Sequence, residues 1–146
     1  MFETPAERKW IIWTGVVILA ITTLPYIIAY SHYSNQILTG MLIGVEDGNS
    51  YIAKMRLGAE GAWLFRSPYT TAEQKGFLAF LPYMMIGKFT SGPGQHDQLV
   101  FLFHAFRWVA GLFLTLVTYI FCAQFFKRVA LRRIATIIIL IGGGSG

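Results

Sequence analysis

Two neighbouring acids, Glu46 and Asp47, stand in a polar stretch between long apolar segments and are the side chains best suited to chemistry. Ser50 is predicted to cap a short helix over residues 51–57, which ends at Gly58. Asp47 then lies just before a helix N-terminus, where the helix dipole favours an ionised carboxylate. A carboxylate in this place is suited to act as a general base or a metal ligand. The alternative is that both acids are turn residues, since Asp is common in turns.

A second polar group consists of His104, Arg107 and Trp108, which have the i, i+3 and i+4 spacing of one helix face. A charge near the end of a membrane span is expected to face a polar cavity or another protein group. The guanidinium of Arg107 matches phosphate oxygens as a fork, so an anionic lipid phosphate is a candidate partner. The alternative is that Arg107 extends to the lipid headgroups without a specific partner.

The composition indicates a membrane protein. The chain of 146 residues is 55% hydrophobic and 13% charged, whereas a soluble domain carries about a quarter charged residues. The net charge of +5 comes with basic clusters beside the apolar runs, which are explained by the positive-inside rule better than by nucleic-acid binding. The single Cys122 excludes a disulfide within the chain.

Two apolar runs have the length of a membrane span. Residues 10–30 carry no charge and reach roughly 30 Å as a helix, and the second span covers about 100–126, most clearly from Trp108 onward. Basic residues before the first span and after the second are both expected in the cytoplasm. We therefore predict a single membrane domain over 1–146 with a cytoplasmic N-terminus and an outer loop at about 31–98. A signal peptide is the competing interpretation of the first run, which is longer than a usual h-region.

Two shorter apolar segments are predicted not to cross the membrane as complete spans. Residues 76–89 contain Pro82, and we expect an interfacial helix that is capped by Thr70 with Glu73 or by Thr71 with Gln74. A third apolar segment begins at Ile134 and stops at GGGSG, which we interpret as a truncated membrane helix. The predicted fold class is thus an all-α membrane protein with two full transmembrane helices, the start of a third, and an outer loop with amphipathic interfacial helices.

The order of these features resembles the N-terminal part of GT-C-type integral membrane glycosyltransferases, in particular the dolichyl-phosphate-mannose mannosyltransferase and aminoarabinose transferase group. The likeness covers nearly the whole chain and rests on short motifs. In this chain Gly48 stands where the family has its second acid, and Glu46 precedes Asp47 instead. The matching segments are Asp47-Gly48-Asn49-Ser50-Tyr51, Gly61-Ala62-Trp63, Pro68-Tyr69 and Phe103 to Trp108.

The resemblance implies transfer of a sugar from a polyprenyl-phosphate donor at the outer face of a bacterial inner membrane. The enzyme would be a multi-pass membrane protein, and this chain would be its N-terminal portion, which is expected to be inactive alone. It implies no certain cofactor and leaves a divalent metal open. The alternatives are a small non-catalytic subunit of a membrane complex and part of a transporter. The implied catalytic residues are Asp47 and Glu46, and the implied substrate-binding residues are Tyr51, Lys54, His104 and Arg107.

Overall fold

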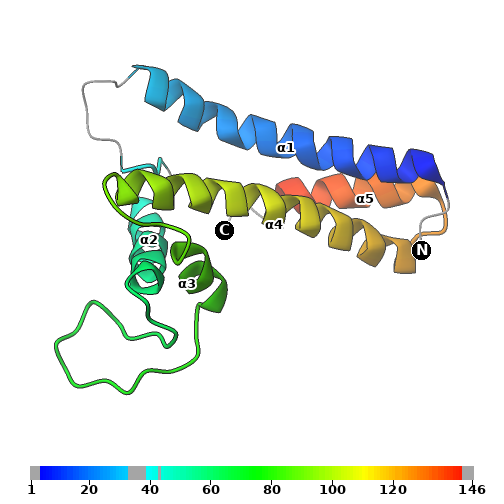
Figure 1. Cartoon of the computed structure of the whole chain (residues 1–146). Coiled ribbons are helices and arrows are strands. Elements are labelled where there is room, and N and C mark those ends of the chain that lie inside the picture. The colour runs from blue at the N-terminus through cyan, green and yellow to red at the C-terminus, as the bar shows by residue number, and fades with distance from the viewer. Residues whose placement is uncertain (1–3, 33–38, 43, 143–146) are drawn as a thin grey trace. The chain divides into compact units, whose positions relative to one another are not determined.

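The computed structural model describes residues 4–32, 39–42 and 44–142. Apart from one isolated antiparallel bridge between Phe65 and Phe77, the regular structure in these ranges is helical, which confirms the predicted all-α class. The helices in the described ranges are α1 (Pro5–His32), α2 (Val45–Ala59), α3 (Leu81–Gly87), α4 (Gln95–Phe125) and α5 (Val129–Gly142) (Figure 1).

Helices α1 and α4 are long and apolar enough to cross a membrane. They contain 28 and 31 residues, or about 42 and 46 Å at the helical rise. Within the most apolar 18 residues of each helix, only 17% of α1 and 11% of α4 is buried. The apolar side chains of both helices are therefore mostly exposed, whereas the core helix of a soluble protein would be buried. Helix α5 has 14 residues, about 21 Å, so its predicted identity as the start of a third span stays a prediction.

The chain divides into two compact units, which are described separately. Unit 1 consists of Met1–Leu24 and Arg107–Gly146, and unit 2 is Pro25–Phe106. In unit 1, α1 and α4 approach closely at two glycines. A Cβ on Gly15 would lie 2.9 Å from Leu112 Cδ2, and a Cβ on Gly111 would lie 2.6 Å from Leu19 Cδ2. Small residues at such positions let membrane helices pack together.

Unit 2 is held together by the packing of α2 on α3. A Cβ on Gly58 would overlap the backbone carbonyl of Met84, and a Cβ on Gly87 would overlap that of Met55. Both methionine side chains are fully buried. The core of this unit is a cluster of Met41, Ile52, Met55, Leu99 and Val100.

Helix α2 begins six residues earlier than the sequence predicted. Its N-cap is Gly44, which has a left-handed conformation with φ of 62° and no side-chain cap. Ser50 therefore lies inside the helix, and its hydroxyl accepts a hydrogen bond from Lys54 Nζ at 2.9 Å instead of capping. Gly58 stays helical because its missing side chain admits α3. Asp47 consequently lies in the first turn of α2 and not before it.

The interfacial helix predicted over 76–89 is also shorter in the structure. It covers only α3, where Pro82 falls in the first turn, a position that tolerates the missing backbone N–H. Neither predicted capping box forms. The Thr70 hydroxyl accepts a bond from the backbone N–H two residues on, and the Gln74 amide bonds the backbone N–H and carbonyl of Ser67. These side chains form turns because Thr and Gln can satisfy nearby backbone groups.

Candidate functional site

Three of the predicted site residues share one face of α2. Asp47, Tyr51 and Lys54 have the i, i+4 and i+7 spacing that aligns side chains along a helix, and we call this set the α2 face. Asp47 and the adjacent Glu46 are exposed, whereas Tyr51 and Lys54 are half-buried. Acids in the first turn interact favourably with the positive end of the helix dipole. The α2 face thus presents a water-accessible carboxylate at the start of the helix.

Lys54 is held in place by two kinds of contact. Besides its bond to Ser50, its Nζ lies 4.5 Å from the centroid of the Tyr51 ring and 4.1 Å from that of Phe80. Such placements are favourable cation–π geometry. An ammonium has three N–H donors, of which the Ser50 hydroxyl takes one. At the helical rise, the Cα positions of Asp47 and Lys54 are about 10 Å apart along α2.

Tyr51 is fixed by a stack of three aromatic rings. Its ring centroid lies 4.6 Å from Tyr83 on α3 and 6.0 Å from Phe103 on α4, and those two rings are 6.4 Å apart. Burial, together with the neighbouring Tyr51, raises the pKa of the Tyr83 hydroxyl above its usual 10.0. The stack joins α2, α3 and α4 around the middle of α2.

His104 fastens the segment that precedes α2. Its Nε2 lies 3.0 Å from the carbonyl oxygen of Gly40, and because a carbonyl can only accept, Nε2 carries the proton. The ring also meets Tyr26 edge-on at 4.8 Å. Gly40 has a φ of +87°, and a Cβ there would overlap the Val100 side chain. These contacts give His104 a structural role, and its predicted contact with substrate stays a prediction.

Arg107 belongs to unit 1, whereas the α2 face belongs to unit 2. Its Nη2 donates to the Thr23 hydroxyl at 2.6 Å and its Nη1 to the Thr22 carbonyl at 3.4 Å. Trp108 Nε1 donates to the same hydroxyl at 3.1 Å. Arg107 and Trp108 thereby tie α4 to α1, a contact that their spacing along α4 did not predict. The predicted binding of a lipid phosphate by Arg107 stays a prediction.

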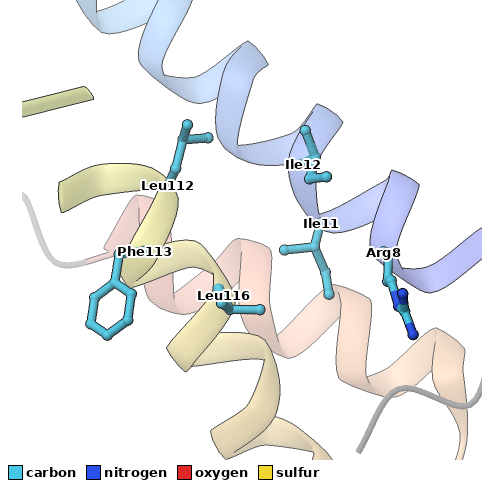
Figure 2. Close-up of a pocket in the computed structure, with 6 residues that line it drawn as sticks. All are labelled: Arg8, Ile11, Ile12, Leu112, Phe113 and Leu116. Carbon is cyan, nitrogen blue, oxygen red and sulfur yellow. The ribbon is translucent and has the colours of Figure 1, made fainter. Parts of the chain in front are cut away.

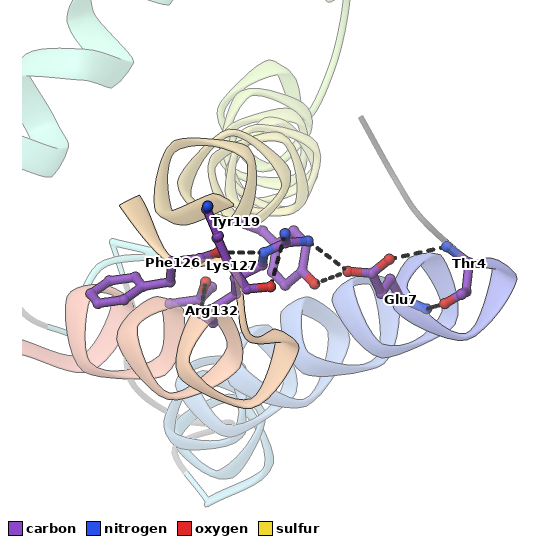
Figure 3. Close-up of polar contacts among 7 residues, drawn as sticks. Thr4, Glu7, Tyr119, Phe126, Lys127 and Arg132 are labelled. Atoms are coloured by element: carbon purple, nitrogen blue, oxygen red, sulfur yellow. Dashed lines mark hydrogen bonds and ion pairs between the residues drawn. The ribbon is translucent and has the colours of Figure 1, made fainter. Parts of the chain in front are cut away.

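A buried polar network in unit 1, shown in Figure 3, was not predicted from the sequence. Glu7 is 1% exposed, accepts a hydrogen bond from the Tyr119 hydroxyl, and pairs with Arg132 Nη1 at 3.3 Å. Glu7 also completes a capping box, since Thr4 N donates to Glu7 Oε2 at 3.0 Å and Glu7 N to the Thr4 hydroxyl at 3.4 Å. The Thr-x-x-Glu pattern at residues 4–7 is the signal that could have revealed it.

Arg132 completes the network from α5. Its Nε donates to the Phe126 carbonyl at 2.7 Å and its Nη2 to the Lys127 carbonyl at 3.2 Å. These carbonyls follow the last turn of α4, where backbone acceptors lack helical partners. Arg132 is 6% exposed, so it joins the ends of three helices, although its charge alone had suggested only a surface cluster beside the membrane.

The α2 face offers a carboxylate, an aromatic surface and an ammonium, which suit a polar or anionic substrate. Within the part of the chain that the structure describes, no group of three His, Cys, Asp or Glu side chains could hold a metal ion. Comparison with protein-family models, curated proteins and solved structures finds no match for the chain.

Proposed function

We propose that the chain is the N-terminal portion of a polyprenyl-phosphate-sugar-dependent glycosyltransferase that acts at the outer face of a bacterial inner membrane. The α2 face carries the proposal, because it combines an exposed Asp47 with a fixed Tyr51 and an oriented Lys54. The order of elements adds support. Two short helices with polar connections lie between helices that are long and apolar enough to cross a membrane.

The proposed reaction is an inverting displacement at the anomeric carbon. The carboxylate of Asp47 accepts the proton of the acceptor hydroxyl as its oxygen bonds to the anomeric carbon. The bond from that carbon to the phosphate oxygen breaks, and polyprenyl phosphate leaves with the bonding electrons. The ammonium of Lys54 offers charge-assisted hydrogen bonds to the phosphate as negative charge gathers on it. Tyr51 supplies an apolar surface between the two groups.

The test uses the complete reading frame, expressed and assayed in native membranes with a panel of radiolabelled polyprenyl-phosphate sugars. Asp47→Asn should lower transfer by a factor on the order of 100 or more, the usual contribution of a general base. Asp97→Asn is the matched control, because Asp97 is also an acid in the first turn of a helix. Wild-type turnover in Asp47→Asn would reject the role as base. Glu46→Gln should cost less than Asp47→Asn, since Glu46 lies off the α2 face.

A non-catalytic subunit is the second candidate, and exposed aromatic side chains favour it. Trp63, Tyr69 and Phe89 are 61%, 71% and 81% exposed, and aromatic residues are enriched at protein interfaces. This candidate predicts no sugar transfer with any donor. It also predicts a co-purifying membrane protein that is lost in Trp63→Ala and Tyr69→Ala variants. Transfer that persists in these variants and is lost in Asp47→Asn would favour the enzyme.

The proposed orientation places the N-terminus in the cytoplasm and α2 outside, in accord with the basic residues that flank the candidate spans. A single cysteine at Asn49 should react with an impermeant maleimide added to intact cells, and one at Arg128 should not. Both positions are exposed, whereas Arg132 is buried and would be a poor reporter. Cys122 is replaced by Ser in the background protein. The reverse labelling pattern would overturn the orientation.

A further inference from the structure

Unit 1 carries an open groove of about 340 Å³ between α1 and α4 (Figure 2). Ile11 and Ile12 line it from α1, and Leu112, Phe113 and Leu116 line it from α4. Arg8 lies at one end, about one helical turn from the isoleucines. The volume falls at the lower end of the usual range for ligand sites, about 300–1,000 Å³. The groove thus has apolar walls and a cationic end.

The walls of this groove are typical of a surface that faces lipid. Close packing of membrane helices depends on small residues, and Gly15 and Gly111 are already used in the contact between α1 and α4. The groove is lined by large side chains instead, with Ile12 59% and Phe113 65% exposed. An acyl chain can follow such an irregular apolar surface, whereas a second helix would need small residues to approach it.

The position of Arg8 along α1 matches the depth of a lipid headgroup. Helix α1 is about 42 Å long and the hydrocarbon core of a bilayer about 30 Å, so its terminal turns extend into the headgroup region. Arg8 lies in the second turn, and Trp10, a residue type enriched at the interface, follows. The isoleucines one turn further on then enter the hydrocarbon.

Unit 1 holds further basic residues beside the start of α1 and in the connection that follows α4. The guanidinium carbon of Arg133 lies 5.2 Å from the centroid of the Trp10 ring, and the ion pair of Arg132 with Glu7 holds the start of α5 beside the start of α1. Lys127 and Arg128, in the connection between α4 and α5, are exposed. Such a cluster attracts anionic lipid over zwitterionic lipid.

We propose that this groove binds an anionic phospholipid, with one acyl chain along the apolar walls and the phosphate at the Arg8 guanidinium, in the leaflet that holds the N-terminus of α1. The planar guanidinium offers paired N–H donors that fit two phosphate oxygens. The apolar walls supply affinity for the chain, and the cationic end selects the charge of the headgroup. The site is separate from the α2 face and does not depend on glycosyl transfer.

The experiment measures which lipids stay with the purified full-length chain. The protein is reconstituted in nanodiscs with equal amounts of phosphatidylglycerol and phosphatidylcholine that have identical acyl chains, extracted gently, and analysed by native mass spectrometry. Wild-type protein should retain phosphatidylglycerol preferentially. Arg8→Gln should lower this preference about tenfold, the effect of losing a hydrogen bond to a charged group, and Arg8→Lys should preserve most of it.

Lys9→Gln is the matched control, because it removes the same charge from the same turn and does not line the groove. It should leave the preference within about twofold, since general attraction to the surface is shared among many basic residues. Equal losses in Arg8→Gln and Lys9→Gln would overturn the proposal in favour of non-specific attraction. Displacement of the lipid by excess soluble glycerol 3-phosphate would overturn the lipid assignment. Retention of neither lipid, with disulfide dimers formed by Phe113→Cys, would identify a second copy of the chain as the occupant.

Discussion

The buried ion pair between Glu7 and Arg132 yields the sharpest stability prediction, tested by Glu7→Gln. Glutamine is nearly isosteric with glutamate, but its one carbonyl oxygen can accept either from the Thr4 backbone N–H or from the Tyr119 hydroxyl, which bond different oxygens of Glu7. The substitution therefore removes the negative charge and one acceptor oxygen, with little change in side-chain volume. What remains is a guanidinium that is 6% exposed and has lost the carboxylate of Glu7.

The expected cost is about 3 kcal/mol of unfolding free energy. Removing one partner of a buried ion pair typically costs about 3–5 kcal/mol, because the other charge stays buried and uncompensated. The lower end applies here because Arg132 keeps its bonds to the carbonyls of Phe126 and Lys127. Adding Arg132→Met to Glu7→Gln also removes the buried positive charge, so the double variant should recover about 1–2 kcal/mol relative to the sum of the single effects.

The assay is reversible unfolding in mixed micelles by titration with an anionic denaturing detergent, followed by tryptophan fluorescence. Glu46→Gln is the control, because it neutralises an exposed acid in unit 2. A loss below about 1 kcal/mol in Glu7→Gln, which is typical of exposed ion pairs, would refute the inference that water is excluded from the pair. Additive effects in the double variant would show that the two side chains are not coupled.

Two further predictions concern unit 2. Gly58→Ala should lower its unfolding free energy by about 1–3 kcal/mol, measured by the same titration, because the new Cβ overlaps the Met84 carbonyl; a gain of about 1 kcal/mol from helix propensity alone would contradict the close contact. Since the folded pKa of Tyr83 is raised above 10.0, its contribution to stability is complete below pH 10.0 and is lost as the pH rises through the folded pKa. Tyr83→Phe should reduce the loss of unfolding free energy at alkaline pH, and an unchanged pH profile would show that Tyr83 does not cause this loss.

The sequence predicted helix type and approximate place well where apolar composition alone decides. The run at 10–30 lies within α1, and the run at about 100–126 matches α4 except that the helix ends at Phe125. Helix boundaries were predicted less well, because local capping patterns compete with tertiary contacts. Ser50 has the right type for an N-cap, yet α2 starts at Val45 because Gly44 supplies the turn and the helix is held by its packing on α3.

The candidate site was likewise predictable from the sequence only where short-range periodicity decides. The periodicity of α2 aligns Asp47, Tyr51 and Lys54 once the helix is known to begin at Val45, so their shared face is readable from the sequence. The aromatic stack around Tyr51 was not readable, since Tyr83 and Phe103 come from separate helices. The contacts of Arg107 with Thr22 and Thr23 likewise join residues more than 80 positions apart.

By itself, the sequence determined that this chain is helical, rich in apolar residues, and interrupted by a polar segment that carries Glu46 and Asp47, because these properties depend on composition and short-range periodicity. Only the tertiary structure decided that Glu7 and Arg132 are partners, that Lys54 lies against aromatic rings, and that Arg8 ends an apolar groove. A charge has the same sequence signature whether it is solvated or paired. Its environment depends on side chains that folding brings from distant segments.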